Sequence, residues 1–264
     1  MLKNSLSTST EKPLVSVILP VNKYNPYLDK SIDSISLQSY PFIELIIIAN
    51  CCTDEFYDYL NKRASENIKV FRTDISYLPY CLNKGLDQCE GEFVARMDSD
   101  DISHPERIAR QVDFLVKNPD IDVVGTNTIY INESDFEIGK SRLPENSISI
   151  VKTLPYKCCL VHPSIMFRRS VIARAGGYMF ANYSEDYELW NRLIANGVRI
   201  YNLQDYLFYY RIHNDQSTSK DNLYIVMVND IAIKIKYFLI TKRISYLFGI
   251  IRTVASVLYC KYIK

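Results

Sequence analysis

Apolar and polar positions along the first hundred residues predict four short strands, with a helix after each of the first three. The strands are apolar runs rich in β-branched residues, and they cover residues 14–19, 44–49, 69–72 and 92–97. The intervening helices have apolar positions at helical spacing over residues 27–37, 54–64 and 82–89, and Thr53-Asp54 can cap the second of them. Short apolar strands that alternate with helices indicate an α/β, Rossmann-like fold with a mainly parallel central sheet flanked by helices.

The pattern is less regular in the second half of the chain. It predicts a helix after Pro105, a short strand at residues 122–124, a polar loop over residues 133–145 and a helix over residues 187–195. Ser184 precedes this last helix, and we expect its side chain to cap the helix N-terminus. Residues 13–219 are predicted to form one domain.

Residues 220–264 predict a basic amphipathic helical tail. Apolar side chains recur there at spacings of three and four, at Tyr237, Ile240, Ile244, Leu247, Ile251, Ala255, Leu258 and Tyr262. The pattern fits one helix, or two helices broken near Gly249. Two interpretations of the apolar stripe are open: it packs on its own domain or on a partner chain, or residues 237–262 contact a membrane surface.

Three of the predicted strands end in polar segments. These segments are Pro20-Val21-Asn22, Asn50-Cys51-Cys52 and Asp98-Ser99-Asp100-Asp101. Ligands of parallel sheets bind in the crevice beyond the carboxyl ends of the strands. The sequence therefore predicts that the three segments converge on one ligand-binding crevice.

The acidic segment after the fourth strand is a candidate metal site. None of the eight glycines forms a dinucleotide-binding fingerprint or a P-loop, so a phosphate ligand must be neutralised in another way. Asp98, Asp100 and Asp101 repel one another at the end of a buried strand unless a cation balances them. A solvated turn is the alternative interpretation, and the position directly after an apolar strand favours a divalent ion held by carboxylates.

A second acidic segment, from Ser184 to Trp190, contains Glu185, Asp186 and Glu188. Carboxylates in the first turn of a helix are ordinary helix-start chemistry. Alternatively, one of them points into the crevice as a general base, a role that raises rates by about 10²–10⁴-fold. Both interpretations are open from the local sequence.

Charge is distributed unevenly, although the formal net charge is only +1. Residues 221–264 carry seven basic and two acidic residues, so the rest of the chain is mildly acidic. A nucleic-acid-binding protein would carry the positive charge on its folded body, so we expect no nucleic-acid partner. A basic tail is better suited to a position near anionic lipid.

The seven cysteines include two vicinal pairs and no C-x-x-C motif, which predicts reduced thiols in a cytoplasmic protein. The polar N-terminal residues predict no signal peptide, and no apolar run reaches the length of a membrane span. We therefore expect a cytoplasmic location, with peripheral attachment to the inner face of the membrane as an open option. Homo-oligomerisation is also left open.

Taken together, these motifs resemble the family 2 glycosyltransferases, with the A-type glycosyltransferase fold, over about Val15 to Ser219. The matching segments are Val15–Val21, Ser34–Tyr40, Glu44–Ile48, Leu82–Gly85, Gly91–Asp101, His104–Arg107, His162–Ser164, Glu185–Trp190 and Tyr210–His213. Each segment alone is a weak signal, but their order and spacing are similar to those of the family. The resemblance implies that residues 13–219 are the catalytic domain.

The resemblance also implies roles for individual residues. Asp186 matches the family's catalytic base, and Glu185 and His162 are expected on the acceptor side. Asp98, Asp100 and His213 are expected to hold Mg²⁺ or Mn²⁺ on the diphosphate. The nucleotide sugar is expected to contact Pro20, Val21, Asn22, Asn50, Asp54, Asn83, Arg96, Asp98 and Ser99.

Two segments depart from the family pattern. Asn22-Lys23 stands where the family usually has Tyr-Asn, and Ala49-Asn50 stands where it usually has the Asp-Asp pair that serves the nucleotide base. A carboxylate accepts hydrogen bonds only, whereas the Asn50 amide can both donate and accept. A UDP-sugar is the default expectation for the donor.

The resemblance implies an inverting, metal-dependent glycosyltransferase. It would move a sugar from a nucleoside-diphosphate sugar to a saccharide or lipid-linked saccharide, in synthesis of a bacterial surface polysaccharide or lipooligosaccharide. Two alternatives remain: a catalytically silent sugar-nucleotide-binding subunit of the same fold, and a sugar nucleotidyltransferase. The nucleotidyltransferases need an N-terminal Gly-rich basic loop, which residues 20–27 lack.

Overall fold

The four strands predicted for the N-terminal half are present and lie side by side. The structure is a computed structural model that describes residues 12–179, 183–213 and 222–262. The strands are β1 (Val15–Val21), β2 (Ile43–Asn50), β3 (Ile68–Thr73) and β4 (Phe93–Arg96). They are parallel and follow the order β3-β2-β1-β4, so their carboxyl ends share one edge of the sheet. The predicted parallel α/β arrangement is confirmed.

The predicted helices between these strands are also present. They are α1 (Leu28–Ser36), α2 (Asp54–Asn61) and α3 (Leu78–Gln88). The hydroxyl of Thr53 accepts a hydrogen bond from the backbone N–H of Phe56, which confirms Thr53 as the cap of α2. Helix α3 begins four residues earlier than predicted, because Pro79 in its first turn is compatible with a helix start.

The second half adds strands of both directions to the same sheet. These are β5 (Ile102–Ser103), β6 (Val123–Ile131), β7 (Glu137–Lys140), β8 (Met166–Arg168) and β9 (Ile200–Arg211). The sheet order is β3-β2-β1-β4-β8-β6-β9-β5, with β7 pairing on β6. Strand β8 is antiparallel to both β4 and β6, whereas β6 and β9 are parallel. The strand predicted at 122–124 is therefore too short, and the predicted polar loop contains β7.

Five helical segments connect these strands: α4 (Arg107–Lys117), α5 (Ser147–Thr153), the 3₁₀ turn η1 (His162–Ser164), α6 (Arg169–Arg174) and α7 (Glu185–Ala195). The predicted side-chain cap at Ser184 is wrong, because its hydroxyl makes no capping hydrogen bond. The backbone N–H of Tyr187 donates instead to Asp186 Oδ1 at 2.7 Å, so a carboxylate satisfies this helix start.

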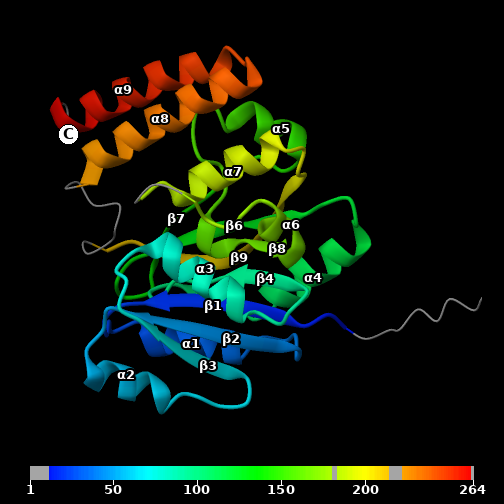
Figure 1. Cartoon of the computed structure of the whole chain (residues 1–264), viewed down its shortest axis with the longest axis vertical. Coiled ribbons are helices and arrows are strands. Elements are labelled where there is room, and N and C mark those ends of the chain that lie inside the picture. The colour runs from blue at the N-terminus through cyan, green and yellow to red at the C-terminus, as the bar shows by residue number, and fades with distance from the viewer. Residues whose placement is uncertain (1–11, 180–182, 214–221, 263–264) are drawn as a thin grey trace, which may run out of the picture.

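Two apolar cores lie on opposite faces of the sheet (Figure 1). On one face, α1, α2 and α4 pack against the side chains of β1 and β2 that point toward that face. On the other face lie α3, α5, α6 and α7, together with residues from the C-terminal helices. Val17 of β1 belongs to the first core and Ile18 to the second, as expected for a strand that is buried on both sides.

The tail forms an α-helical hairpin of α8 (Leu223–Thr241) and α9 (Ser245–Tyr262). The predicted break near Gly249 is wrong, because α8 ends at Lys242 in the left-handed conformation with φ of 59°. Gly249 lies inside α9, where a Cβ atom would stand 1.9 Å from the carbonyl oxygen of Pro155. The glycine therefore allows α9 to pack closely against Pro155 and does not break the helix.

The hairpin packs on α7 through its inner face. Tyr237 and Tyr246 are buried in the second core, and Lys234 Nζ donates to Asp230, Thr253 and the carbonyl of Gly249. Of the described side chains of the predicted apolar stripe only Tyr237 is buried, whereas the others, such as Ile240 and Ile251, are exposed. The hairpin does pack on the chain's own domain, but it does so mainly through residues outside that stripe, such as Tyr246. Among the described helices, none combines the length and apolar character that a membrane span requires.

The contact at Gly249 yields a stability prediction. We expect Gly249→Ala to lower the free energy of unfolding by about 1–3 kcal/mol, because backbone atoms of Pro155 or α9 must move to admit the methyl group. Gly139→Ala on β7 is the matched control, since its Cβ would meet Tyr130 at an ordinary 3.5 Å. Urea denaturation of both variants measures the difference. Equal stability of the two variants would show that the approach of α9 to Pro155 is not tight.

Candidate functional site

The carboxyl ends of β1, β2 and β4 open into a cleft of about 1030 Å³. The end of β1 contributes Pro20, Val21 and Asn22, and the end of β2 contributes Asn50. The acidic segment after β4 contributes Asp98, Ser99 and Asp100. The predicted convergence of the three segments is confirmed. The cleft is also lined by Arg96, His162, Glu185, Asp186 and His213, so twelve residues proposed from the sequence line one cleft.

The acidic segment is held in place by hydrogen bonds from two other elements. Ser31 Oγ of α1 donates to the carbonyl oxygen of Asp98 at 2.7 Å. Arg211, at the end of β9, donates from Nε to the carbonyl of Asp100 and from its backbone N–H to Asp101 Oδ1, each at 2.8 Å. These bonds leave the carboxylates of Asp98 and Asp100 facing the cleft.

The three carboxylates are close enough to share a cation. Asp98, Asp100 and Asp101 each offer an oxygen within 4.8 Å of the others. Burial raises the pKa of Asp98 and Asp101, and the charge of Asp100 raises both further. The guanidinium of Arg96 pairs with Asp98 and opposes the rise. Arg211 also bonds to this segment but shares its charge with Asp135. A divalent cation would therefore stabilise the three carboxylates.

The donor set fits a hard divalent ion. Asp101 Oδ2 is buried and has no hydrogen-bond partner among the described residues. His213 Nε2 lies 2.8 Å from Asp100 Oδ2, which places an imidazole beside the carboxylates. Carboxylate oxygens with an adjacent imidazole suit Mg²⁺ or Mn²⁺. Asp101 was part of the acidic motif in the sequence but was not assigned as a ligand, and the geometry adds it to the cluster.

Glu185 and Asp186 occupy the first turn of α7 at the cleft wall. Burial raises the pKa of Glu185 to about 7, and the neighbouring Asp186 charge adds to the rise. Glu185 Oε2 has no hydrogen-bond partner in the described part of the chain. Burial also raises the pKa of Asp186, although the Tyr187 N–H and Arg96 favour its charged form. Cys158 Sγ lies 3.8 Å from Asp186 Oδ2.

His162 is a neutral member of the same wall. Its Nε2 atom lies 2.8 Å from the hydroxyl of Tyr178, and its ring packs edge-on against Trp190. Burial, and then the charge of Arg96, hold the pKa of His162 well below its usual range. A neutral imidazole at this position can exchange hydrogen bonds with a hydroxyl but carries no charge.

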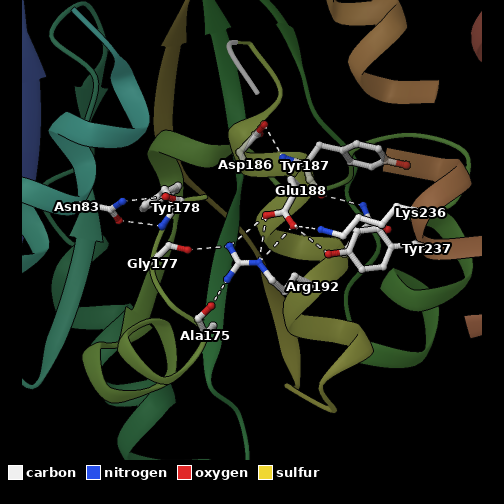
Figure 2. A network of polar contacts seen from close by, with 11 residues as sticks. Asn83, Ala175, Gly177, Tyr178, Asp186, Tyr187, Glu188, Arg192, Lys236 and Tyr237 are labelled. Atoms are coloured by element: carbon white, nitrogen blue, oxygen red, sulfur yellow. Dashed lines mark hydrogen bonds and ion pairs between the residues drawn. The ribbon is translucent and has the colours of Figure 1, made fainter. Parts of the chain in front are cut away.

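A buried carboxylate, Glu188, ties α7 to the tail and to the loop before it (Figure 2). Lys236 Nζ and the hydroxyl of Tyr237 donate to Glu188 Oε1 at 2.9 and 3.0 Å. Arg192 Nη2 lies 3.0 Å from Glu188 Oε2, and its guanidinium also donates to the carbonyls of Ala175 and Gly177. These charged hydrogen bonds lower the pKa of Glu188 despite its burial. The network fixes the helix that carries Asp186.

Two residues that were expected to contact the nucleotide sugar do not line the cleft. Asp54 is exposed at the start of α2 and pairs with Arg72. The Asn83 amide exchanges two hydrogen bonds of 2.8 Å with the backbone of Tyr178, as Figure 2 shows. Asn83 thereby positions the partner of His162. Sequence reasoning missed Cys158, Tyr178 and Arg211 as contributors. Cys158 and Tyr178 stand in no matching segment, and in the Tyr210–His213 segment only His213 was given a role.

Comparison with known proteins places this arrangement in a family. Residues 16–176 match the sequence profile described as Glycosyl transferase family 2. The chain belongs to glycosyl transferase family 2. It is therefore a glycosyltransferase, and the family match decides against the sugar nucleotidyltransferase alternative.

Curated relatives and a solved structure agree with this membership. "O-antigen biosynthesis glycosyltransferase WbnJ" of Escherichia coli is 39% identical over 80% of this chain and 84% of its own length. "UDP-Gal:alpha-D-GlcNAc-diphosphoundecaprenol beta-1,3-galactosyltransferase" of Escherichia coli is 32% identical over 75% of this chain and 74% of its own. The fold is similar to that of the mannosyltransferase PcManGT from Pyrobaculum calidifontis in complex with GDP-Man and Mn²⁺. The TM-score is 0.66 at 16% identity, over 96% of this chain and 76% of that one.

The buried carboxyl of Glu185 predicts a pH-dependent stability. Its pKa of about 7 lies above the value of an unfolded glutamate, so the folded chain keeps a proton that the unfolded chain loses. This contribution is complete below about pH 4 and is lost as the pH rises through 7. We expect the metal-free wild-type chain to lose about 1–3 kcal/mol more than Glu185→Gln between pH 5 and about 8.

The measurement is urea denaturation of both chains across this pH range with a chelator present. The comparison isolates Glu185, because other titrating groups are common to the two chains. Parallel stability curves would show that Glu185 is not held in its protonated form.

Proposed function

We propose that this enzyme is an inverting, metal-dependent glycosyltransferase that moves a sugar from a UDP-sugar to a lipid-linked saccharide during surface-polysaccharide synthesis. One observation carries the proposal: Asp98 and Asp100 of the carboxylate cluster line the same cleft as the Glu185–Asp186 pair. The cluster suits a sugar diphosphate with its counter-ion, and the pair suits the hydroxyl that attacks the sugar. The relatives named above act in O-antigen synthesis and on a diphosphoundecaprenol-linked sugar, as their names state.

Asn50 supports a uracil base in the donor. Its Nδ2 lies 3.0 Å from Cys81 Sγ, and the thiol of Cys81 donates toward the carbonyl of Ile75 at 3.7 Å. A thiol has one hydrogen, so a sulfur that donates to Ile75 accepts from Asn50. Asn50 Oδ1 is then left as an acceptor, which is buried and receives no hydrogen bond from a described residue. Asn50 lines the cleft, so a small turn of its amide would bring this acceptor to the imide N–H of uracil, which a carboxylate would otherwise accept.

Asp98, Asp100 and Asp101 are the residues that would hold Mg²⁺ or Mn²⁺, with His213 beside Asp100. When bound, such an ion stabilises the negative charge of the departing nucleoside diphosphate, an effect of several kcal/mol. Arg96 pairs with Asp98 and opposes the rise of its pKa, which favours the ionised form that a cation binds. Asn25 Nδ2 donates to Ser99 Oγ at 3.1 Å and fixes the residue between the two acids.

Asp186 is proposed to act as the general base. Its carboxylate takes the proton of the acceptor hydroxyl while that oxygen bonds to the anomeric carbon from the face opposite the diphosphate. The bond between the anomeric carbon and the diphosphate oxygen breaks, and the nucleoside diphosphate leaves with the bonding electrons. The backbone N–H of Tyr187 orients Asp186, and Arg96 favours its ionised form. Glu185 and the neutral His162 are proposed to hold the acceptor by hydrogen bonds.

The base assignment predicts a large loss of turnover. We expect Asp186→Asn to lower kcat by about 10²–10⁴-fold, because the amide has the same shape but cannot accept the proton. Asp113→Asn is the matched control, since Asp113 is exposed on α4 and pairs only with Lys117 among the described residues. UDP release from a panel of UDP-sugars with a polyprenyl-diphosphate-linked acceptor measures the effect. Unchanged turnover in Asp186→Asn would remove it from the mechanism.

The metal assignment is tested separately by binding. We expect Asp100→Ala to weaken Mn²⁺ binding at least about tenfold, whereas Asp205→Ala, at an exposed ion pair with Arg110, leaves it unchanged. Isothermal titration of the metal into each chain with UDP present gives the dissociation constants. Undiminished binding in Asp100→Ala would contradict a site at this cluster. A wild-type chain that binds UDP-sugars but releases no UDP with any acceptor would be a silent binding subunit.

A further inference from the structure

The α8–α9 hairpin exposes more apolar surface than a soluble helix pair needs. On α8 the exposed apolar residues repeat at helical spacing and include Ile225, Val228, Ile235 and Leu239. On α9 they include Leu247, Phe248, Ile251, Val254 and Leu258, and Ile244 is exposed just before this helix. Phe248 and Ile251 are 59% and 66% exposed. Contiguous apolar surface of this kind marks a binding surface rather than ordinary exposure.

These exposed residues do not pack in the core of the chain. The side that faces α7 is already filled by Ile233, Tyr237 and Tyr246. Glu188 and the buried Lys234 contacts hold that side in place. The hairpin lies at the end of the molecule opposite α2 and β3, where its outer helix α9 faces away from the sheet (Figure 1). The outer face therefore needs a partner from outside the described chain.

The charge on the hairpin is mainly positive. From Leu223 to Lys264 the sequence has seven basic residues and one acidic residue, Asp230. Lys234 pairs with Asp230 and Lys236 with Glu188, and Arg252 donates to the carbonyl of Tyr156. Lys242 and Arg243 are exposed at the turn between the helices. The complementary partner is apolar with negative charge at its border.

A second copy of this chain does not have that character. A two-fold interface brings the same patch of each subunit together, so basic residues would face basic residues. An anionic bilayer offers both required features, an apolar interior and negatively charged headgroups. Because no described helix can cross the membrane, the hairpin would lie within the interface.

We propose that the outer face of the α8–α9 hairpin docks on an anionic membrane surface. Its apolar stripes enter the interface, and Lys242 and Arg243 meet the lipid phosphates. Since α8 is bonded to α7 through Glu188, a docked hairpin holds the helix of Asp186 at a fixed place relative to the bilayer. The surface is independent of the transfer reaction, so binding can be measured without substrate.

Flotation of the full chain with vesicles tests the inference. We expect it to float with vesicles of phosphatidylcholine and phosphatidylglycerol, and far less with phosphatidylcholine alone. The double variant Phe248→Glu/Ile251→Glu is expected to lower the vesicle-bound fraction at least about tenfold. Lys242→Gln/Arg243→Gln is expected to lower it and to weaken its salt dependence. Leu37→Glu, at an exposed leucine after α1, is the matched control and leaves flotation unchanged.

Circular dichroism and thermal melting establish that the variants are folded. Failure of the wild-type chain to float with anionic vesicles would overturn the inference, as would flotation that Phe248→Glu/Ile251→Glu does not reduce. Light scattering measures the oligomeric state and so tests whether a second copy of the chain covers this face instead. A wild-type dimer that this double variant converts to a monomer would assign the face to a second copy. None of these results depends on UDP release, so failure here leaves the proposed reaction standing.

Discussion

The crowding of carboxylates at one edge of the sheet is the constraint on which the rest of the site depends. Asp98, Asp100 and Asp101 follow β4, and Glu185 and Asp186 come to the same cleft from α7. Like charges in a desolvated place raise one another's pKa unless opposite charges are fixed nearby. The fold supplies Arg96 within the cleft and Arg211 at the end of β9, each held by bonds to the acidic segment. The two arginines leave part of the negative charge of the carboxylates unbalanced. A cation that arrives with the nucleotide sugar can balance it.

The parallel half of the fold was predictable because its pattern is local. Buried strands such as β1 and β2 are apolar on both faces, and the side-chain cap at Thr53 needs only residues three apart in sequence. The convergence of Pro20, Asn50 and Asp98 follows from parallel strands sharing one edge. Their placement at one cleft therefore required no knowledge of the second half of the chain.

Other features depend on contacts between distant segments, and the sequence carries no local signal for them. Ser184 looks like a helix cap, but Asp186 accepts the helix N–H instead. Asn83 stands in a family motif, yet it holds the backbone of Tyr178, 95 residues away. Gly249 suggests a helix break, whereas the structure uses it to bring α9 against Pro155. In each case tertiary packing decides between roles that the residue type allows equally.

The bonds of Glu188 to Lys236 and Tyr237 have a consequence for the order in which the protein is assembled in the cell. During synthesis α7 leaves the ribosome well before α8, and its buried carboxylate then lacks two of its donors. Tyr237 and Tyr246 are also missing from the second core at that stage. A nascent chain folds domain by domain, and a domain completes its packing only when all of the segments that pack in it have been synthesised. Completion of the cleft wall must therefore wait until translation has passed Tyr246.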